Sequence, residues 1–190
     1  MGWNLLYGLF NGVLGLVYRS AWFATMGVYH LTLGFMRLAV VSLPVDRSGR
    51  RSEGSVLRHN GIAMLFLALV LSVSVAMSFL YSVHRSYPQV VMIAIAAYTF
   101  FLAGLAIRNV VRAQKDRSLT MIDLRDISLA GVTASMLTLQ RSMIATFGGE
   151  SSDFALVMNG AAGLGAFLIV LALGIAMIVQ GRGSKKGGNQ

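Results

Sequence analysis

The sequence predicts an all-α integral membrane protein, a helical bundle of five transmembrane spans with an N-terminal interfacial helix. Composition is the first observation, because 56% of the residues are hydrophobic and 12% are charged, with a mean hydropathy of +0.69. Length is the second, since several apolar runs reach the ~20 residues that cross ~30 Å of hydrocarbon. The third is charge, because basic residues gather in alternate loops between these runs.

The first segment, residues 3–18, is apolar with a helical period and is short for a span. One side holds Leu5, Leu6, Leu9, Val13 and Leu16, whereas Asn4, Tyr7, Asn11 and Tyr18 lie toward the other. Tryptophan and tyrosine, which prefer the membrane interface, stand near both of its ends. We therefore expect an interfacial helix that bends into the first span near Arg19. The alternative is that this segment also crosses the membrane, which gives six spans.

Five longer apolar runs follow and form, with the first segment, a single bundle over residues 1–181. Pro44 and a hydrophilic stretch end the first of these runs. The third is expected to continue as a helix through RNVVRAQK, where basic residues recur at helical spacing. A basic, glycine-rich tail at 182–190 is predicted to be disordered. The predicted spans are residues 21–43, 61–83, 89–107, 127–147 and 154–179.

The distribution of basic residues predicts the orientation. Loops 44–60 and 108–126 and the C-terminal tail hold most of the lysines and arginines, whereas the opposite loops hold Arg19 and Arg85. By the positive-inside rule, the first set of loops and the C-terminus are cytoplasmic. The N-terminus is then outside with five spans and inside with six.

Arg141, next to Gln140, is the most costly residue in the predicted spans, since insertion scales charge ~2.5–3.5 kcal/mol for a mid-bilayer arginine. In one interpretation, Arg141 faces the interior of the bundle and binds an anion there. The preferred interpretation is that it reaches the outer headgroups or pairs with Glu150 or Asp153.

His30 could relay a proton or bind a metal, but a hydrogen bond to a hydroxyl of another helix is the preferred interpretation. Arg37 lies seven residues later on the same helical face and is most simply an interface anchor. These two residues, with Gln140 and Arg141, are the candidate intramembrane polar site.

Small and hydroxyl residues predict the helix-packing surfaces. In the fourth span, Ser135 and Thr138 belong to a stripe that repeats every three or four residues. In the fifth span, Gly160 and Gly163 belong to a smooth surface that permits close helix approach. We prefer packing over a substrate path for both stripes.

The sequence lacks the patterns of several function classes. It contains no cysteine, no HExxH and no GxSxG, so we expect no enzyme activity, no cofactor and no metal site. Asp123 and Asp126 are three residues apart and are interpreted as a solvated cap of the fourth span. The basic residues form no single soluble face, so nucleic acid is not an expected partner.

Several short motifs resemble a family of small, uncharacterised polytopic membrane proteins from Firmicutes and their relatives. They are YHLTLGFMR in the first span, SMLTLQRSM at 135–143, and MNG at 158–160. The resemblance implies a multi-pass protein of the bacterial cell membrane and assigns no activity. In the family pattern a small polar residue usually stands at the position of Arg141 and an aromatic one at that of His30. This implies that neither residue carries an essential activity.

Together these features favour a structural or accessory membrane subunit. Its partners would be the lipid bilayer and other membrane proteins, or further copies of itself. The alternative is a small oligomeric transporter or channel, which needs a wet interior lined by His30, Gln140 and Arg141.

Overall fold

The computed structural model describes residues 2–42, 50–80, 88–116, 118–147 and 152–186, and this part of the chain is all-α, as the sequence predicts. It contains six helices and no strand. The helices are α1 (Gly2–Val17), α2 (Ala21–Ser42), α3 (Arg50–Leu80), α4 (Gln89–Asp116), α5 (Leu119–Phe147) and α6 (Ser152–Lys186).

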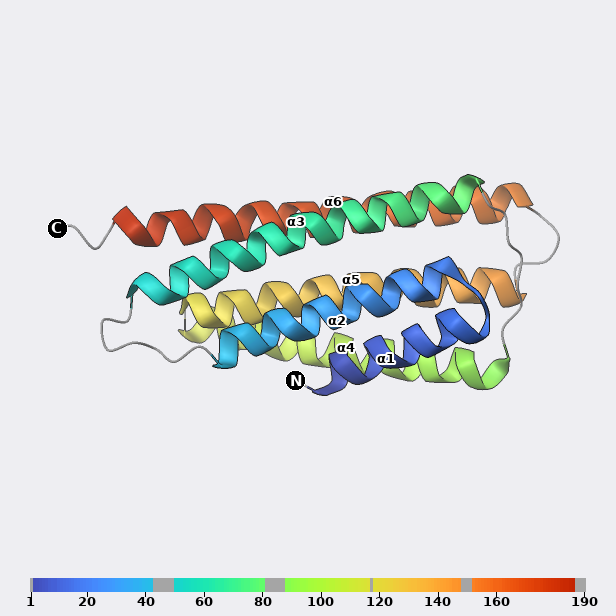
Figure 1. Ribbon diagram of the computed structural model, residues 1–190, viewed down its shortest axis with the longest axis horizontal. Helices are drawn as coiled ribbons and strands as arrows, with labels where there is room; N and C mark the ends of the chain where they lie inside the picture. The colour runs from blue at the N-terminus through green and yellow to red at the C-terminus, as the bar shows by residue number, and fades with distance from the viewer. Residues whose placement is uncertain (1, 43–49, 81–87, 117, 148–151, 187–190) are drawn as a thin grey trace.

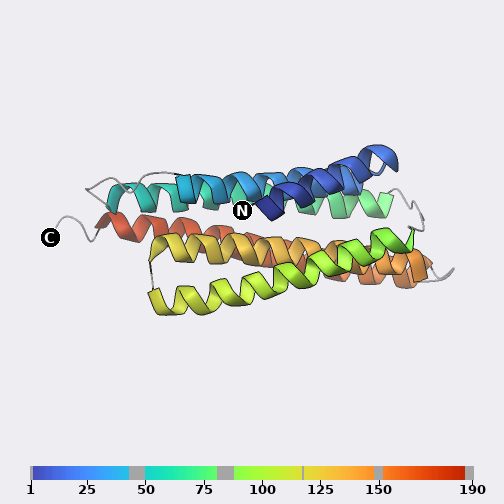
Figure 2. The same ribbon diagram turned by 90° about the horizontal axis from the view of Figure 1, so that it is seen from below.

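The six helices run along one long axis and form three antiparallel pairs (Figures 1 and 2). The most extensive contacts join α3 to α6, α1 to α2 and α4 to α5. Helix α5 also contacts α2, α3 and α6, so it lies among the other long helices. The ends of α2, α4 and α6 and the starts of α3 and α5 share one end of the bundle (Figure 1).

A tight reversal joins α1 to α2. The Ser20 amide donates to the Gly15 carbonyl (2.9 Å) and the Arg19 amide to the Leu16 carbonyl (3.3 Å), with Arg19 at φ 46°. This is the hydrogen-bond pattern of a left-handed helix C-cap, the Schellman motif. The bend predicted near Arg19 is therefore a complete turn, and α1 folds back along α2.

Glycines set the separation of α1 and α2. A Cβ at Gly27 would lie 2.9 Å from the backbone nitrogen of Gly12, and one at Gly15 would lie 2.7 Å from that of Ala24. The two residue numbers in each contact have the same sum, as expected for the register of two antiparallel helices. Backbone atoms cannot move aside as a side-chain tip can, so the two helices depend on glycine for this approach.

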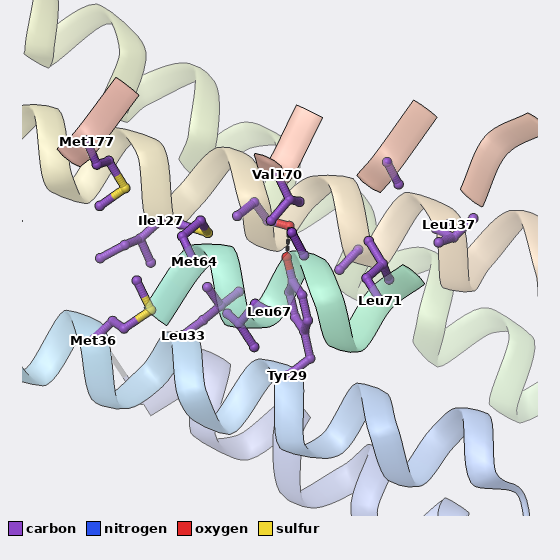
Figure 3. Close-up of a cluster of buried hydrophobic side chains, with 14 of the residues drawn as sticks. Tyr29, Leu33, Met36, Met64, Leu67, Leu71, Ile127, Leu137, Val170 and Met177 are labelled. Carbon is purple, nitrogen blue, oxygen red and sulfur yellow. Dashed lines mark hydrogen bonds between the residues drawn. The ribbon is translucent and has the colours of Figure 1, made fainter. Parts of the chain in front are cut away.

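One hydrophobic core is shared by α2, α3, α5 and α6 (Figure 3). At its centre the Tyr29 ring is fully buried, and its hydroxyl donates to the Ala130 carbonyl at 3.4 Å. Helices α1 and α4 lie outside this core and meet α2 and α5 around a smaller cluster that contains Leu14, Phe23 and Ile95. The labelled core residues in Figure 3 are Tyr29, Leu33, Met36, Met64, Leu67, Leu71, Ile127, Leu137, Val170 and Met177.

Helices α3 and α6 are longer than the apolar runs that predicted them, as is α5, which begins at Leu119 rather than near residue 127. Helix α3 begins at Arg50 rather than near residue 61, and α6 continues to Lys186. The prediction of a disordered tail is therefore wrong for residues 182–186, while 187–190 lie outside the described residues. The extensions of α3 and α6 pack on each other, since a Cβ at Gly181 would lie 2.8 Å from the Gly54 carbonyl oxygen. A helix end follows its hydrogen bonds and packing, so it does not stop where hydrophobicity stops.

In the described part of the chain, four helices are long and apolar enough to cross a membrane, by length and composition: Ala21–Ser42, Glu53–Ala76, Gln89–Lys115 and Asp153–Arg182. They overlap the predicted first, second, third and fifth spans, and support the prediction of a membrane protein. Helix α5, which contains the predicted fourth span, is not among the four. Its serines, threonines, Gln140 and Arg141 lower its hydropathy, and much of its surface is covered by neighbouring helices.

Gly163 provides a test of the α3–α6 contact. A Cβ there would lie 2.6 Å from Val75 Cγ1, whereas one at Gly165, two residues away on the same helix, would meet nothing within 4 Å. Gly163→Leu should lower the free energy of unfolding by about 1–3 kcal/mol through overpacking, and Gly165→Leu should not. Thermal unfolding in detergent measures both variants. Equal stability of the two would show that α6 does not rely on this close approach.

Candidate functional site

His30 lies at the middle of α2 and is fully buried. Its Nε2 atom is 3.5 Å from the Ser135 hydroxyl on α5, a contact whose donor depends on the imidazole tautomer. The contact is at the outer limit of a hydrogen bond, so it contributes little to the stability of the fold. This is the arrangement that the preferred interpretation of His30 describes, a histidine beside a hydroxyl of another helix.

Aromatic rings from three helices surround His30. The Tyr7 ring of α1 meets the imidazole edge-on (4.8 Å between centroids, 88°), and Tyr98 of α4 stacks on Tyr7 (3.6 Å, 12°). The Tyr98 hydroxyl lies 3.1 Å from Asn4 Oδ1 and 3.3 Å from the Trp3 carbonyl. The polar side of α1 therefore faces the bundle and brings Tyr7 to the histidine and Asn4 to Tyr98.

Arg37 lies two turns further along α2 and is half-buried. Its Nη2 atom donates to the Ser128 hydroxyl oxygen, which also accepts from Asn109 Nδ2 of α4. Ser128 in turn donates to the Leu124 carbonyl at 2.6 Å. One serine thus links α2, α4 and α5, and Arg37 is more than the interface anchor that the sequence suggested.

Gln140 and Arg141 make separate contacts near the opposite end of α5. Gln140 Nε2 donates to the Met158 carbonyl of α6 at 3.1 Å. The Arg141 guanidinium lies over the Trp22 ring of α2, 4.1 Å from its centroid, in a cation–π contact. Of the partners expected for Arg141, Glu150 lies outside the described residues and Asp153 is exposed on α6.

The four candidate residues do not form one site. Arg37 bonds to Ser128 and His30 contacts Ser135, which are seven residues, or roughly 10 Å of helix, apart on α5. Gln140 and Arg141 contact α6 and α2 further along. What joins these contacts is the predicted stripe of small and hydroxyl residues on α5. All five of its members are buried: Ser128, Gly131, Ser135, Thr138 and Ser142.

Of the predicted packing glycines, Gly163 lies against Val75 and Gly160 is half-buried. Thr138 donates to the Ala134 carbonyl of its own helix at 2.9 Å, and Thr99 of α4 donates to Ile95 in the same way at 2.8 Å. Such bonds to the preceding turn satisfy a buried hydroxyl without a ligand.

The interpretation of Asp123 and Asp126 as a solvated cap is wrong. Asp123 is 2% exposed and Asp126 is 0% exposed, and the cap of α5 is Ser118, whose hydroxyl accepts from the Met121 amide (3.2 Å). Asn60 Nδ2 of α3 donates to Asp123 Oδ2 at 2.9 Å, and Arg125 Nε donates to Asp126 Oδ1 at 2.8 Å. The spacing of three places both carboxyls on one face of the helix, but it does not say that this face is buried.

Burial is the main influence on the pKa values of Asp123 and Asp126, which precede the predicted fourth span. The pKa of Asp123 is raised from 3.8 to about 7, chiefly by burial; the Asn60 hydrogen bond opposes this rise and the charge of Asp126 adds to it. Burial also raises the pKa of Asp126, against the lowering effect of Arg125.

Comparison of the chain with protein families, with curated proteins and with solved structures finds no match.

Tyr98 tests how α1 is held against the bundle. Tyr98→Phe keeps the ring stacked on Tyr7 but removes the hydroxyl that reaches Asn4 and Trp3. The expected loss is about 1 kcal/mol of unfolding free energy, because a hydroxyl donates a single hydrogen bond. Tyr98→Leu should cost about 0.5–1.5 kcal/mol more, since the stacking is lost as well.

Thermal unfolding in detergent measures the stability of both Tyr98 variants, and amide hydrogen exchange reports on α1. Faster exchange confined to α1 in Tyr98→Phe is the expected signature. Unchanged exchange in α1 would mean that the glycine contacts with α2 hold the helix alone.

Proposed function

We propose that this protein is a six-helix integral membrane bundle that acts as a structural or accessory subunit of a larger membrane assembly. The proposal is based on the contacts that the polar side chains make inside the bundle. His30, Arg37, Gln140 and Arg141 each contact a different neighbour, and buried hydroxyls bond to their own helices. Polar groups that join helices in this way stabilise a scaffold.

The surface of α1 supports its insertion in the membrane. Leu6, Leu9, Val13 and Leu16 point away from the bundle and are more than half exposed, whereas Asn4, Tyr7 and Asn11 are buried against it. A helix lying at a water interface turns its polar side to water, so this arrangement fits a helix whose outer side meets lipid.

The register of α1 on α2 supports six spans rather than five. Leu5 lies against Gly34 and Leu31 against Gly8, so the start of α1 is level with Arg37. Its 16 residues span roughly 24 Å, short of the ~30 Å hydrocarbon thickness by an amount that local thinning accommodates. The N-terminus then shares the cytoplasmic side with the basic loops and the C-terminus.

Cysteine labelling tests this topology, because the chain has no cysteine of its own. In intact cells an impermeant thiol reagent should label Ser20→Cys, at the turn between α1 and α2, and should spare Ser118→Cys, before α5. Gly2→Cys distinguishes the two topologies: six spans predict protection and five predict labelling. All three should react after permeabilisation. Labelling of Ser118→Cys in intact cells would contradict the proposed orientation.

A small oligomeric transporter is the second candidate. The buried stripe on α5 favours it, because Ser128, Ser135 and Thr138 follow one another along the helix beside Arg37 and His30. A continuous row of polar groups through a bundle is what a proton or small-ion path requires.

Reconstitution separates the two functions. Purified protein in liposomes that contain a pH-sensitive dye should show no proton or cation flux above that of empty liposomes. On gentle solubilisation of native membranes, the protein should migrate with a defined set of membrane proteins. Flux from the purified protein, lost in His30→Leu and kept in Gly165→Leu, would replace the accessory function with transport.

A further inference from the structure

We propose that Asp123 and Asp126 of α5, with Asn60 of α3, form a proton-binding site at the basic end of the bundle, with the proton held on Asp123. Two carboxyls lie on one helical face, and a donor from a second helix reaches one of them. The proposal does not depend on the accessory function, because it rests on the burial and the hydrogen bonds of these two carboxyls.

Unpartnered oxygens point to a missing positive charge. Asp123 Oδ1 and Asp126 Oδ2 are buried and accept no hydrogen bond from the described part of the chain. Each carboxyl is partnered through its other oxygen, by Asn60 and by Arg125. A buried carboxylate oxygen without a donor is costly, and binding a proton removes that cost.

The charges around the pair do not balance. Among the residues that the structure describes, the two carboxyls share one adjacent cation, Arg125, since Asn60 is neutral. On the neighbouring helices, Arg37 of α2 donates to Ser128 and Arg58 of α3 packs on α6 at Gly181. The described cations of α4 and α6 near this end are exposed to solvent: Arg108, Arg112, Lys115 and Arg182. Within the described part of the chain, one carboxylate is therefore left without an adjacent cation.

The chemistry fits a proton better than a divalent metal. In the residues that the structure describes, no third carboxylate or histidine joins the pair to make a metal-binding group. Ca²⁺ and Mg²⁺ take six or more oxygen ligands, whereas Asn60 presents its amide nitrogen, a hydrogen-bond donor, to the Asp123 carboxyl. Uptake is a simple protonation: a proton from the cytoplasmic water bonds to the Asp123 oxygen, and Asp126 stays ionised with Arg125.

The site makes the α3–α5 contact depend on pH. The pKa of Asp123 in the folded protein is about 7, above its ordinary value of 3.8. The folded state therefore binds the proton more tightly than the unfolded state, and its stabilisation is complete below about pH 4. Stability is lost as the pH rises through about 7, when Asp123 ionises beside Asn60.

Infrared titration tests the site directly in the intact protein. In detergent, the carbonyl band of a protonated carboxyl should disappear as the pH rises through about 7. The band should be absent from Asp123→Asn and present in Asp153→Asn, in which an exposed aspartate of α6 is changed instead. A wild-type protein with no carboxyl that titrates above about pH 5 would overturn the proposal, whatever the variants do.

Two neighbours should move the titration midpoint in opposite directions. Asp126→Asn should lower it by removing a negative charge, and Asn60→Ala should raise it by removing the hydrogen bond that favours the carboxylate. A midpoint that neither variant moves would place the titrating group elsewhere and overturn the assignment. A midpoint that depends on Na⁺ concentration, and not on K⁺, would make Na⁺ the ligand and overturn it as well.

Discussion

The burial of polar residues on α5 is the constraint on which the arrangement of the other helices depends. An unpaired polar group in apolar surroundings costs several kcal/mol, so a helix with this many polar side chains cannot face lipid. Its neighbours therefore supply matching groups: Asn60 from α3, Arg37 from α2 and Asn109 from α4. The central position of α5 and its low hydropathy have the same cause.

The same constraint orients α1. Its short polar side would be an interfacial surface in isolation, but Tyr98 and His30 give that side partners inside the bundle. Leu6, Leu9, Val13 and Leu16 are left on the outside, and glycines at the contact allow α2 to approach closely enough for the polar groups to meet. The packing and the hydrogen bonds of α1 therefore depend on each other.

The sequence predicts the helices better than it predicts their surroundings. Hydrophobic length identifies the long helices because a helix satisfies its own backbone, and glycine spacing identifies the close contact at Gly163. Periodicity shows that Asn4 and Asn11, or Asp123 and Asp126, share a face, but a wet face and a buried one give the same pattern. The cation–π contact of Arg141 with Trp22 gives no signal in the sequence, because Trp22 comes from a helix distant in the chain.

Two kinds of contact hold the three helix pairs together. Within the α1–α2 and α3–α6 pairs, glycines bring backbones together, and such contacts do not depend on pH. Between pairs, polar bonds are added to the shared core: Tyr29 to Ala130, Gln140 to Met158, and Asn60 to Asp123. The last of these bonds joins α3–α6 to α4–α5 through an acid that titrates near neutral pH. Proton binding at Asp123 therefore acts on the contact between two pairs and leaves the pairs themselves intact.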